Sequence, residues 1–382
     1  MPLSYRPKQY EIPWPYTGAL YGSEEEEALV RLVRDAAVKR RPLDRRSPEI
    51  VEFERRFAAY IGAAHAVSLS SGGAALELAT RILGIGLGDE LAVSALTFKA
   101  TVLPIVVAGA RPIPIDIDYE TLNIDFESFE SCVTPKTKAI YLVDYAGLPL
   151  NPEAVMQVAG RNGIPVVEDA AHSLGSAYGA AKCGSWADLS CFSFQSQKNI
   201  STLGEGGMLT TNDEHYAERA RALRNYDHDV QAGGNYRLSA AQCAVGIEQL
   251  KRLDSVNAKR RAIARRMSYA FRDVPGFGTP FEPDGVTHAC HMYPCRLDGS
   301  VFGPVRDTVR KKLLDEYAVE TSFQYEPWYD FPVIRAAMGD FEPCPVMERV
   351  ARELFGLPIF PGYTDDEVGY IIWAVKEVLS SL

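Results

Sequence analysis

The sequence has no long hydrophobic run, no excess of basic residues and no paired cysteine motif. Its apolar stretches fall short of the ~18 residues that a membrane span needs, and its first residues lack the apolar core of a signal peptide. The formal net charge of −10 argues against a general nucleic-acid-binding protein. We therefore expect a cytoplasmic protein that binds neither membranes nor nucleic acid.

The seven cysteines are odd in number, scattered along the chain, and form no Cys-x-x-Cys pair. This usage suits reduced thiols in the cytosol. Residues 288–295 contain His288, Cys290, His291 and Cys295, a set that could ligate zinc. The stretch alternates like a strand, however, which would turn successive side chains to opposite faces. We expect no metal site there.

The length of 382 residues is too great for one small core and favours a large and a smaller domain. Residues 1–22, rich in proline and tyrosine, predict an N-terminal arm. Residues 23–255 predict the large domain. Residues 256–382 mix short strands, Pro/Gly-rich turns and helices, and predict a smaller C-terminal domain.

Short apolar runs alternate with helical patterns through the first half of the chain. Several of these runs are apolar throughout, as strands buried on both faces must be. The alternation predicts a mostly parallel sheet covered by helices, with ligands bound beyond the carboxyl ends of its strands. The expected strands are residues 66–69, 91–94, 111–117, 139–144, 165–168, 189–194 and 208–211. Expected helices include residues 24–38, a helix opening at Ser47 and Pro48, and residues 74–83, 99–108, 152–161, 238–272, 307–317 and 365–379.

A turn of small residues follows the first expected strand and opens a helix. Gly72 and Gly73 would let backbone N–H groups approach a ligand, and a helix start favours an anion. The turn predicts a phosphate site, although such turns also serve only as tight connections.

Two ionisable residues also follow strands. Asp169 ends a strand, where a buried carboxylate needs a cation unless it caps a helix. Lys198 lies on the loop between the last two strands. Loop lysines are usually solvated, but a desolvated one has a lowered pKa and can form a Schiff base. A phosphate site, a carboxylate and such a lysine on one sheet edge together predict pyridoxal 5′-phosphate as cofactor.

The chain resembles the DegT/DnrJ/EryC1/StrS family of sugar and cyclitol aminotransferases from about residue 24 to residue 378. The resemblance implies an α/β fold of the aspartate-aminotransferase type (fold type I), with a mostly parallel seven-stranded sheet in the large domain and a smaller C-terminal α/β domain. The segments that carry it are residues 71–76, 88–90, 97–101, 168–172, 193–194 with Lys198, 204–207, 235–237 and 357–361.

The resemblance also implies roles around the cofactor ring. Lys198 would be the Schiff-base lysine and would move the proton. Asp169 would pair with the pyridine nitrogen, and His172 would contact the 3-hydroxyl group. Phe98 would stack on the ring, although from its sequence context it could equally be a core aromatic residue.

At the phosphate end, the resemblance implies that three residues of one subunit hold the cofactor: Gly72, Gly73 and Ser193. Asn235 would reach the phosphate of the neighbouring subunit's cofactor. The expected assembly is therefore a homodimer with active sites at the subunit interface.

The implied reaction moves an amino group from L-glutamate or L-glutamine to a nucleotide-linked keto-sugar in amino-sugar biosynthesis, with pyridoxamine 5′-phosphate as intermediate. Three alternatives stay open: a keto-cyclitol acceptor, a deoxysugar dehydratase that keeps the fold and cofactor, and a non-catalytic binding protein. Lys198 argues against the second, because the dehydratases of this group replace that lysine by histidine. The presence of the whole predicted site argues against the third.

The chain departs from the family pattern at four single positions and in residues 324–329, which read Gln-Tyr-Glu-Pro-Trp-Tyr where members often have His-Tyr-x-Pro-Leu-His. Gly73 stands where threonine is usual, so one hydroxyl contact to phosphate is lost. Leu203 is an extra residue in the loop after Lys198. Asp144 and Gln195 stand where many members have histidine.

Overall fold

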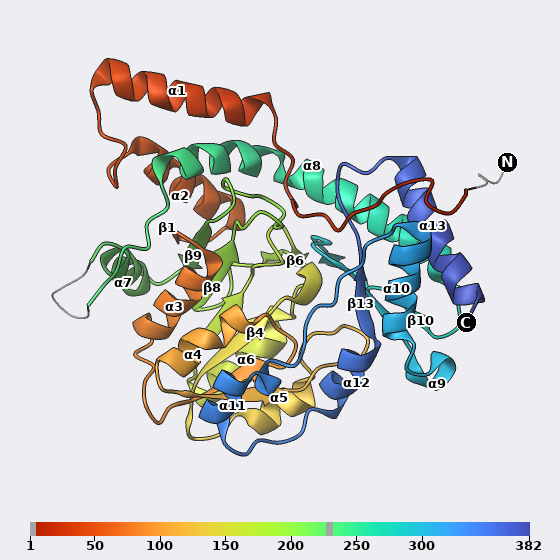
Figure 1. The fold of residues 1–382 in the computed structure, drawn as a ribbon. Coiled ribbons are helices and arrows are strands. Elements are labelled where there is room, and N and C mark those ends of the chain that lie inside the picture. The colour runs from red at the N-terminus through yellow and green to blue at the C-terminus, as the bar shows by residue number, and fades with distance from the viewer. Residues whose placement is uncertain (1–4, 227–231) are drawn as a thin grey trace.

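The computed structural model describes residues 5–226 and 232–382, which form an α/β protein around a seven-stranded sheet (Figure 1). The strand order is β1-β9-β8-β5-β4-β2-β3, and only the pairs that involve β9 are antiparallel. The mostly parallel sheet is thus confirmed, and all seven expected strands are present. They are β1 (His65–Leu69), β2 (Glu90–Ser94), β3 (Arg111–Ile115), β4 (Thr137–Val143), β5 (Val166–Asp169), β8 (Leu189–Ser193) and β9 (Gly207–Thr211).

Helices cover both faces of this sheet, because its strands carry apolar side chains on both sides. One face packs against α3 (Gly72–Ile82), α4 (Leu103–Val107) and α7 (Glu214–Arg224). The opposite face packs against α2 (Pro48–Ile61), α5 (Phe126–Cys132) and α6 (Pro152–Asn162). The carboxyl ends of the parallel strands therefore form an edge at which the loops can meet.

One expected helix is interrupted. Residues 99–108 form a 3-10 turn, η1 (Lys99–Thr101), and then the short helix α4. Pro104 in the first turn of α4 has no N–H group to continue a hydrogen-bond ladder from the preceding turn, which explains the break.

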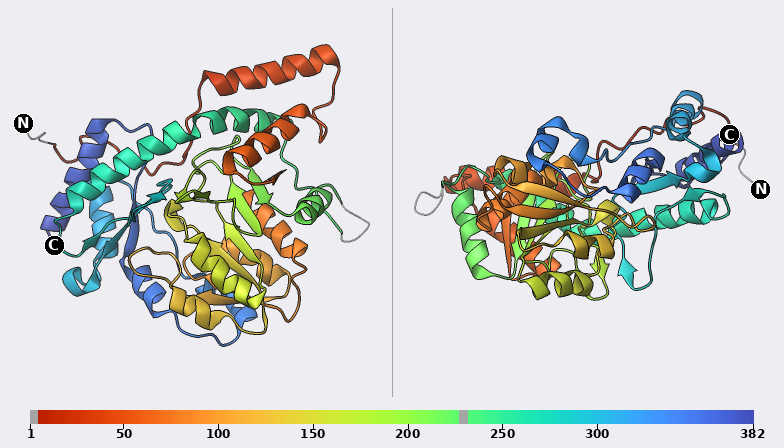
Figure 2. Two further views of the ribbon diagram at one scale, coloured as in Figure 1. Left: turned by 180° about the vertical axis from the view of Figure 1, so that it is seen from behind. Right: turned by 90° about the horizontal axis from the view of Figure 1, so that it is seen from below.

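The long helix α8 (Ala240–Phe271) connects the sheet to a second hydrophobic core (Figure 2). That core lies between α8, α10 (Arg306–Tyr317), α13 (Asp365–Ser380) and a three-stranded sheet of β10 (Phe277–Gly278), β12 (Tyr293–Leu297) and β13 (Leu354–Leu357). The N-terminal arm packs here through Ile12. The boundary predicted at residue 255 falls inside α8 and stays a prediction.

A late segment of the chain returns to the core of the large sheet. It comprises η3 (Trp328–Asp330), α11 (Pro332–Met338) and α12 (Pro345–Glu353). Trp328 and Met347 are fully buried in the same cluster as the strands β1, β2 and β4. Figure 1 shows α11 beside α4, although more than 200 residues separate them. The two cores are therefore not two consecutive halves of the chain.

The remaining elements are short or lie at the surface. Helix α1 (Ser23–Lys39) lies along α8. Among the described residues, no helix is long and apolar enough to cross a membrane. The others are β6 (Ala177–Tyr178), β7 (Ala181–Lys182), β11 (Val286–Thr287), η2 (Tyr145–Gly147) and α9 (Gly299–Phe302).

Candidate active site

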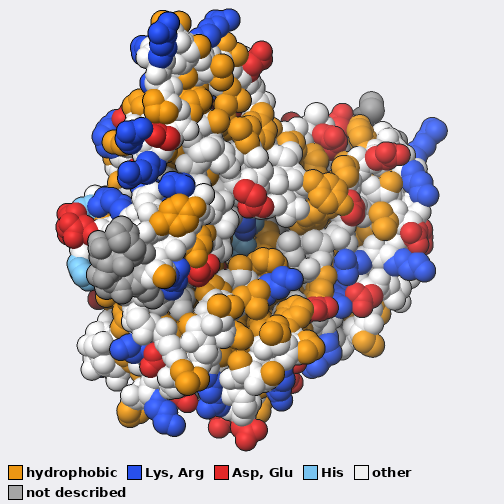
Figure 3. Space-filling view, turned by 60° about the vertical axis from the view of Figure 1, so that its left-hand side comes forward, with side chains coloured by type: hydrophobic (Ala, Val, Ile, Leu, Met, Phe, Trp, Pro, Cys, Tyr) orange, Lys and Arg blue, Asp and Glu red, His pale blue; other side chains and the backbone are white. Residues whose placement is uncertain are grey.

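A cavity of about 390 Å³ opens at the carboxyl edge of the large sheet. Figure 3 shows one face of the molecule, which is hollowed near its centre. Seven of the eight predicted site residues line the cavity, although they are spread over more than 120 positions of the sequence. They are Gly72, Gly73, Phe98, Asp169, His172, Ser193 and Lys198.

The start of α3 forms one end of the cavity. Ser71 caps this helix by accepting the Ala74 N–H group at 3.0 Å. A Cβ atom on Gly72 would fall 2.8 Å from Ser193 Cβ, so only glycine allows the helix start to approach this strand end so closely. A Cβ atom on Gly73 would have no neighbour closer than 3.7 Å. A helix N-terminus thus faces the cavity, as an anion site requires.

Asp169, the last residue of β5, is buried at the centre of the edge. Its carboxylate accepts the Thr101 hydroxyl at 2.7 Å and the Ala171 N–H group at 3.1 Å. Burial raises the pKa of Asp169, while these two hydrogen bonds and the charge of Lys198 lower it. No helix follows Asp169, so the helix-cap alternative is wrong.

Lys198 lies on the loop between β8 and β9, as predicted, and faces the same cavity. Burial lowers the pKa of its amine to about 8, and the charge of Asp169 opposes that shift. A lysine with this pKa offers a share of neutral, nucleophilic amine near neutral pH. The solvated-lysine alternative therefore does not apply.

Aromatic rings form the remaining wall. The His172 ring stacks on His291, with 4.7 Å between ring centroids, and lies 3.3 Å from the Tyr325 hydroxyl through Nε2. Burial and then the charge of Lys198 lower the pKa of His172, so its ring is neutral. Phe98 is 45% exposed and lies 5.5 Å from the Tyr325 ring, so the core-aromatic alternative is wrong.

The sequence profile of the DegT/DnrJ/EryC1/StrS aminotransferase family matches residues 24–376. The chain belongs to this family. It is 36% identical to the spore coat polysaccharide biosynthesis protein SpsC of Bacillus subtilis, over 96% of this chain and 97% of that protein. It is 34% identical to the dTDP-3-amino-3,4,6-trideoxy-alpha-D-glucose transaminase of Streptomyces venezuelae, over 86% and 87% of the two chains.

Solved structures of aminotransferases share the fold. The putative sugar aminotransferase Spr1654 of Streptococcus pneumoniae in its PMP form superposes with a TM-score of 0.88 at 26% identity, over 97% of this chain and 98% of that one. The predicted family, fold type, aminotransferase class and pyridoxal phosphate dependence are thereby confirmed.

The cavity of this DegT-family chain fits that cofactor. The start of α3 lines the cavity through Gly72 and Gly73, and because neither residue has a side chain, a phosphate group can reach this helix start. Asp169 offers a buried carboxylate for a protonated ring nitrogen, and Lys198 offers an amine. The buried Nδ1 atom of His172 has no hydrogen-bond partner among residues 5–226 and 232–382 and could bond to a ligand. The individual contacts of these residues with the cofactor remain predictions.

Thr101 and Tyr325 contact predicted site residues but were assigned no role from the sequence, and of the two only Tyr325 lines the cavity. Thr101 donates to Asp169, and it belongs to the 97–101 segment that carries the family resemblance. Tyr325 packs between Phe98 and His172, and it lies in residues 324–329, where the chain departs from the usual family pattern. Both signals mark a segment of the chain, but neither shows which side chain of that segment contacts the site.

A hydrogen-bond network anchors the Lys198 loop from behind. The Asn199 amide nitrogen donates to Asn257 at 2.8 Å and to the Ala289 carbonyl at 3.1 Å. The Asn199 oxygen therefore accepts from His291 Nδ1, 3.0 Å away. The ring that stacks on His172 is thus tied to the residue that follows Lys198.

The stretch around His291 differs from its expected form. Strand β12 begins only at Tyr293, and the preceding residues are irregular. His288 accepts the Cys290 N–H group at 2.8 Å, whereas His291 bonds to Asn199. A local hydrogen bond therefore orients His288 and a tertiary one orients His291, in place of strand alternation.

The eighth predicted residue, Asn235, lies outside the cavity. It is exposed and pairs with Asn225 through an isolated bridge. Within one chain, the structure does not bring Asn235 to the other seven residues.

The extra residue Leu203 lies at the exposed tip of the Lys198 loop. Its N–H group donates to the Tyr21 hydroxyl at 3.2 Å, and the Gly18 N–H group donates to the Ser196 carbonyl at 2.8 Å. The N-terminal arm therefore lies against this loop at both ends. Gln195, the other departure near Lys198, lines the cavity.

Proposed function

We propose that this aminotransferase transfers the amino group of L-glutamate or L-glutamine to a nucleotide-linked keto-sugar. The observation that carries the proposal is the grouping of Lys198, Asp169 and the start of α3 around one cavity. The similarity to a transaminase of a dTDP-linked amino sugar supports the acceptor class. The similarity to a protein of spore coat polysaccharide biosynthesis favours a role in making glycan precursors.

When bound, pyridoxal phosphate supplies the electron sink that stabilises negative charge on the reacting carbon. Asp169 would hold a proton on the ring nitrogen, for which it must itself be ionised. Lys198 would bind the cofactor and then act as the base and acid that moves a proton at the reacting carbon. The start of α3, with Ser193, would fix the phosphate and so the orientation of the ring.

The acceptor would enter past Tyr325 and Gln195, which line the cavity with Gln324 and Glu205. These side chains offer hydroxyl, amide and carboxylate groups, which suit hydrogen bonds to sugar hydroxyls. A keto-cyclitol offers similar hydroxyls, and the nucleotide preference rests on the relatives.

The test is spectroscopic and is followed by product analysis. Purified protein with cofactor should show a visible absorption band that disappears on addition of L-glutamate or L-glutamine. The amine-loaded protein should then convert a dTDP- or GDP-linked keto-sugar to an amino sugar. Loss of water without gain of nitrogen would identify a dehydratase, whereas turnover of keto-cyclitols alone would reassign the acceptor.

We further propose a homodimer whose active sites each use Asn235 of the other subunit. The exposed position of Asn235 outside its own cavity supports this arrangement. The test mixes inactive Lys198→Ala protein with Asn235→Ala protein under conditions of subunit exchange. A mixed dimer would contain one intact site, so activity should exceed that of either parent. Activity no higher than the sum of the separate variants would contradict a shared site.

We also propose a cytoplasmic location, which the seven free cysteines favour. Labelling of these thiols in intact cells, with a reagent that crosses membranes and with one that does not, would test it.

A further inference from the structure

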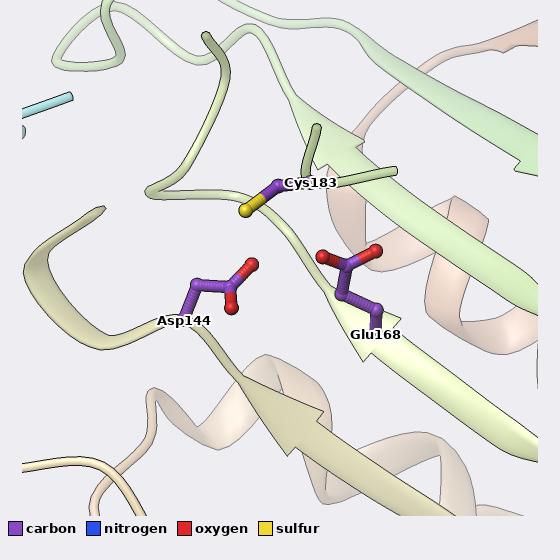
Figure 4. A group of neighbouring side chains, drawn as sticks. All are labelled: Asp144, Glu168 and Cys183. Atoms are coloured by element: carbon purple, nitrogen blue, oxygen red, sulfur yellow. The ribbon is translucent and has the colours of Figure 1, made fainter. Parts of the chain in front are cut away.

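Two carboxyl groups face each other inside the protein, beside the active site but not in its cavity (Figure 4). Asp144 follows β4 and Glu168 lies in β5, the strand next to it. Both are completely buried, and Cys183 joins them. The nearest ligand atoms of the three side chains lie within 4.8 Å of one another. Two like charges in such a place would repel each other strongly.

The hydrogen bonds show where a proton can reside. Asp144 accepts the Leu150 N–H group at 2.9 Å on one oxygen and the Ser173 hydroxyl at 2.7 Å on the other. Glu168 accepts the Ser190 hydroxyl at 2.6 Å and the Gly184 N–H group at 2.8 Å, both on Oε2. Three of the four oxygens are thus acceptors of protein donors. Of the four, only Glu168 Oε1 has no donor within the described part of the chain.

We propose that Asp144 and Glu168 share one proton, carried on Glu168 Oε1 and donated to Asp144, so that the pair holds a single negative charge. A carboxylic acid at Glu168 gives the unpaired oxygen a bond and removes the repulsion. Asp144 remains the ionised partner because both of its oxygens already receive donors.

A metal ion explains the cluster less well. The three buried side chains offer one ligand atom each, whereas a closed structural zinc site takes four protein ligands. Three of the carboxylate oxygens are already bonded to donors of the protein, whose hydrogen atoms face the oxygens. A proton needs only the one oxygen that is free.

Among the described residues, the titratable neighbours of the pair are one carboxyl group and two thiols rather than a cation. The charge of Asp144 acts on Asp169, and the Cys183 and Cys191 thiols are neutral because burial raises their pKa. Burial and then the charge of Asp144 raise the pKa of Glu168 well above its ordinary value, in accord with a retained proton. Because the shared proton leaves Glu168 neutral, Asp144 is the one member of the pair that places a negative charge near Asp169.

The first test is infrared spectroscopy of the purified full-length protein at neutral pH. The wild type should show the carbonyl stretch of a protonated carboxylic acid in the exchange-sensitive difference spectrum. Glu168→Gln should lose that band because it removes the carboxylic acid. The variant should still fold, because its amide nitrogen can donate to Asp144 while its oxygen accepts the other two donors. Glu353→Gln is the matched control: Glu353 is also buried but is bonded to Arg349, and its replacement should leave the band in place.

The second test is unfolding by denaturant across pH. The folded state keeps a proton that the unfolded chain releases above pH ~4.5, so this stabilisation is lost as pH rises. Relative to Glu168→Gln, the unfolding constant of the wild type should rise about tenfold per pH unit until Glu168 ionises. Asp144→Asn should destabilise more than Glu168→Gln, because its amide would face the Ser173 or Leu150 donor.

Three outcomes would overturn the proposal. They are a wild type without the acid band, parallel pH profiles for the wild type and Glu168→Gln, and a stoichiometric metal that Glu168→Gln releases. None of these readouts requires bound pyridoxal phosphate, so they are independent of the proposed function.

Discussion

Glu168 and Asp169 are consecutive residues at the end of one strand, yet their surroundings are opposite. Because successive side chains of a strand point to opposite faces, Asp169 reaches the cavity and Glu168 the closed interior. Burial raises the pKa of both carboxyls. Each carboxyl group accepts two donors of the protein, but Asp169 has the charge of Lys198 nearby, whereas Glu168 meets the carboxyl group of Asp144. Because both residues are buried, the partner rather than the depth of burial accounts for the expected difference, a cation beside Asp169 and a proton on Glu168.

The largest expected effect follows from removing the cation on the Asp169 side. Lys198→Ala should abolish the visible cofactor band and lower transamination by on the order of a thousandfold or more. Absorption spectra and an amino-transfer assay measure both effects. Lys136→Ala, at an exposed position of the large domain, is the control and should change neither.

Comparing Asp169→Asn with Glu168→Gln tests whether only one of the two neighbouring carboxyl groups of β5 serves the reaction. The variant keeps an acceptor for Thr101 but loses the charge, and activity should fall by roughly a hundredfold as the ring proton is no longer stabilised. Glu168→Gln should stay within about threefold of the wild type. Measuring the transamination rates of the two purified variants tests this expected difference. Equal losses would show that the two positions act as one electrostatic unit.

The pKa of Lys198 predicts how the rate of pyridoxal phosphate capture by the cofactor-free protein depends on pH. The neutral amine reacts, so the rate should rise about tenfold per pH unit and level off above a pKa of about 8. Stopped-flow absorbance measures the rate between pH 6 and pH 9. In Asp169→Asn the plateau should begin at lower pH, because the anion that favours the charged amine is gone. A rate that still rises steeply above pH 9 would indicate a solvated lysine.

A smaller effect should come from the hydroxyl donors of the two carboxyls. Thr101→Val removes the 2.7 Å bond to Asp169, which raises its pKa further, and activity should fall about tenfold. Ser190→Ala removes the 2.6 Å bond to Glu168 and should mainly destabilise the fold, by about 1 kcal/mol. Parallel kinetic and denaturation measurements on both variants show whether the losses divide in this way.

Local sequence patterns were sufficient for the strands and for the residues that follow them. Apolar runs specify β5 and β8, and strand ends are where Asp169 and Lys198 were expected. The antiparallel insertion of β9 between β1 and β8 leaves no such pattern, because hydrophobicity does not encode strand order.

Local sequence patterns also could not predict which distant segments contact each other. Tyr325 and His291 reach the site only because late parts of the chain fold back, and no periodicity marks those positions. The departure at Asp144 was visible in the sequence, but its partner Glu168 was not, since only the parallel pairing of β4 with β5 brings them together.

The return of residues 328–350 to the large core affects the order of events during synthesis. Trp328 donates its indole N–H to the Ser94 carbonyl at 2.9 Å, which closes the core beside β2. When the ribosome has translated all seven strands of the large sheet, it has not yet made Trp328 or Tyr325, the latter a residue of the cavity wall. The nascent chain therefore cannot form a complete cofactor pocket until residues 325–328 have been synthesised, long after β9.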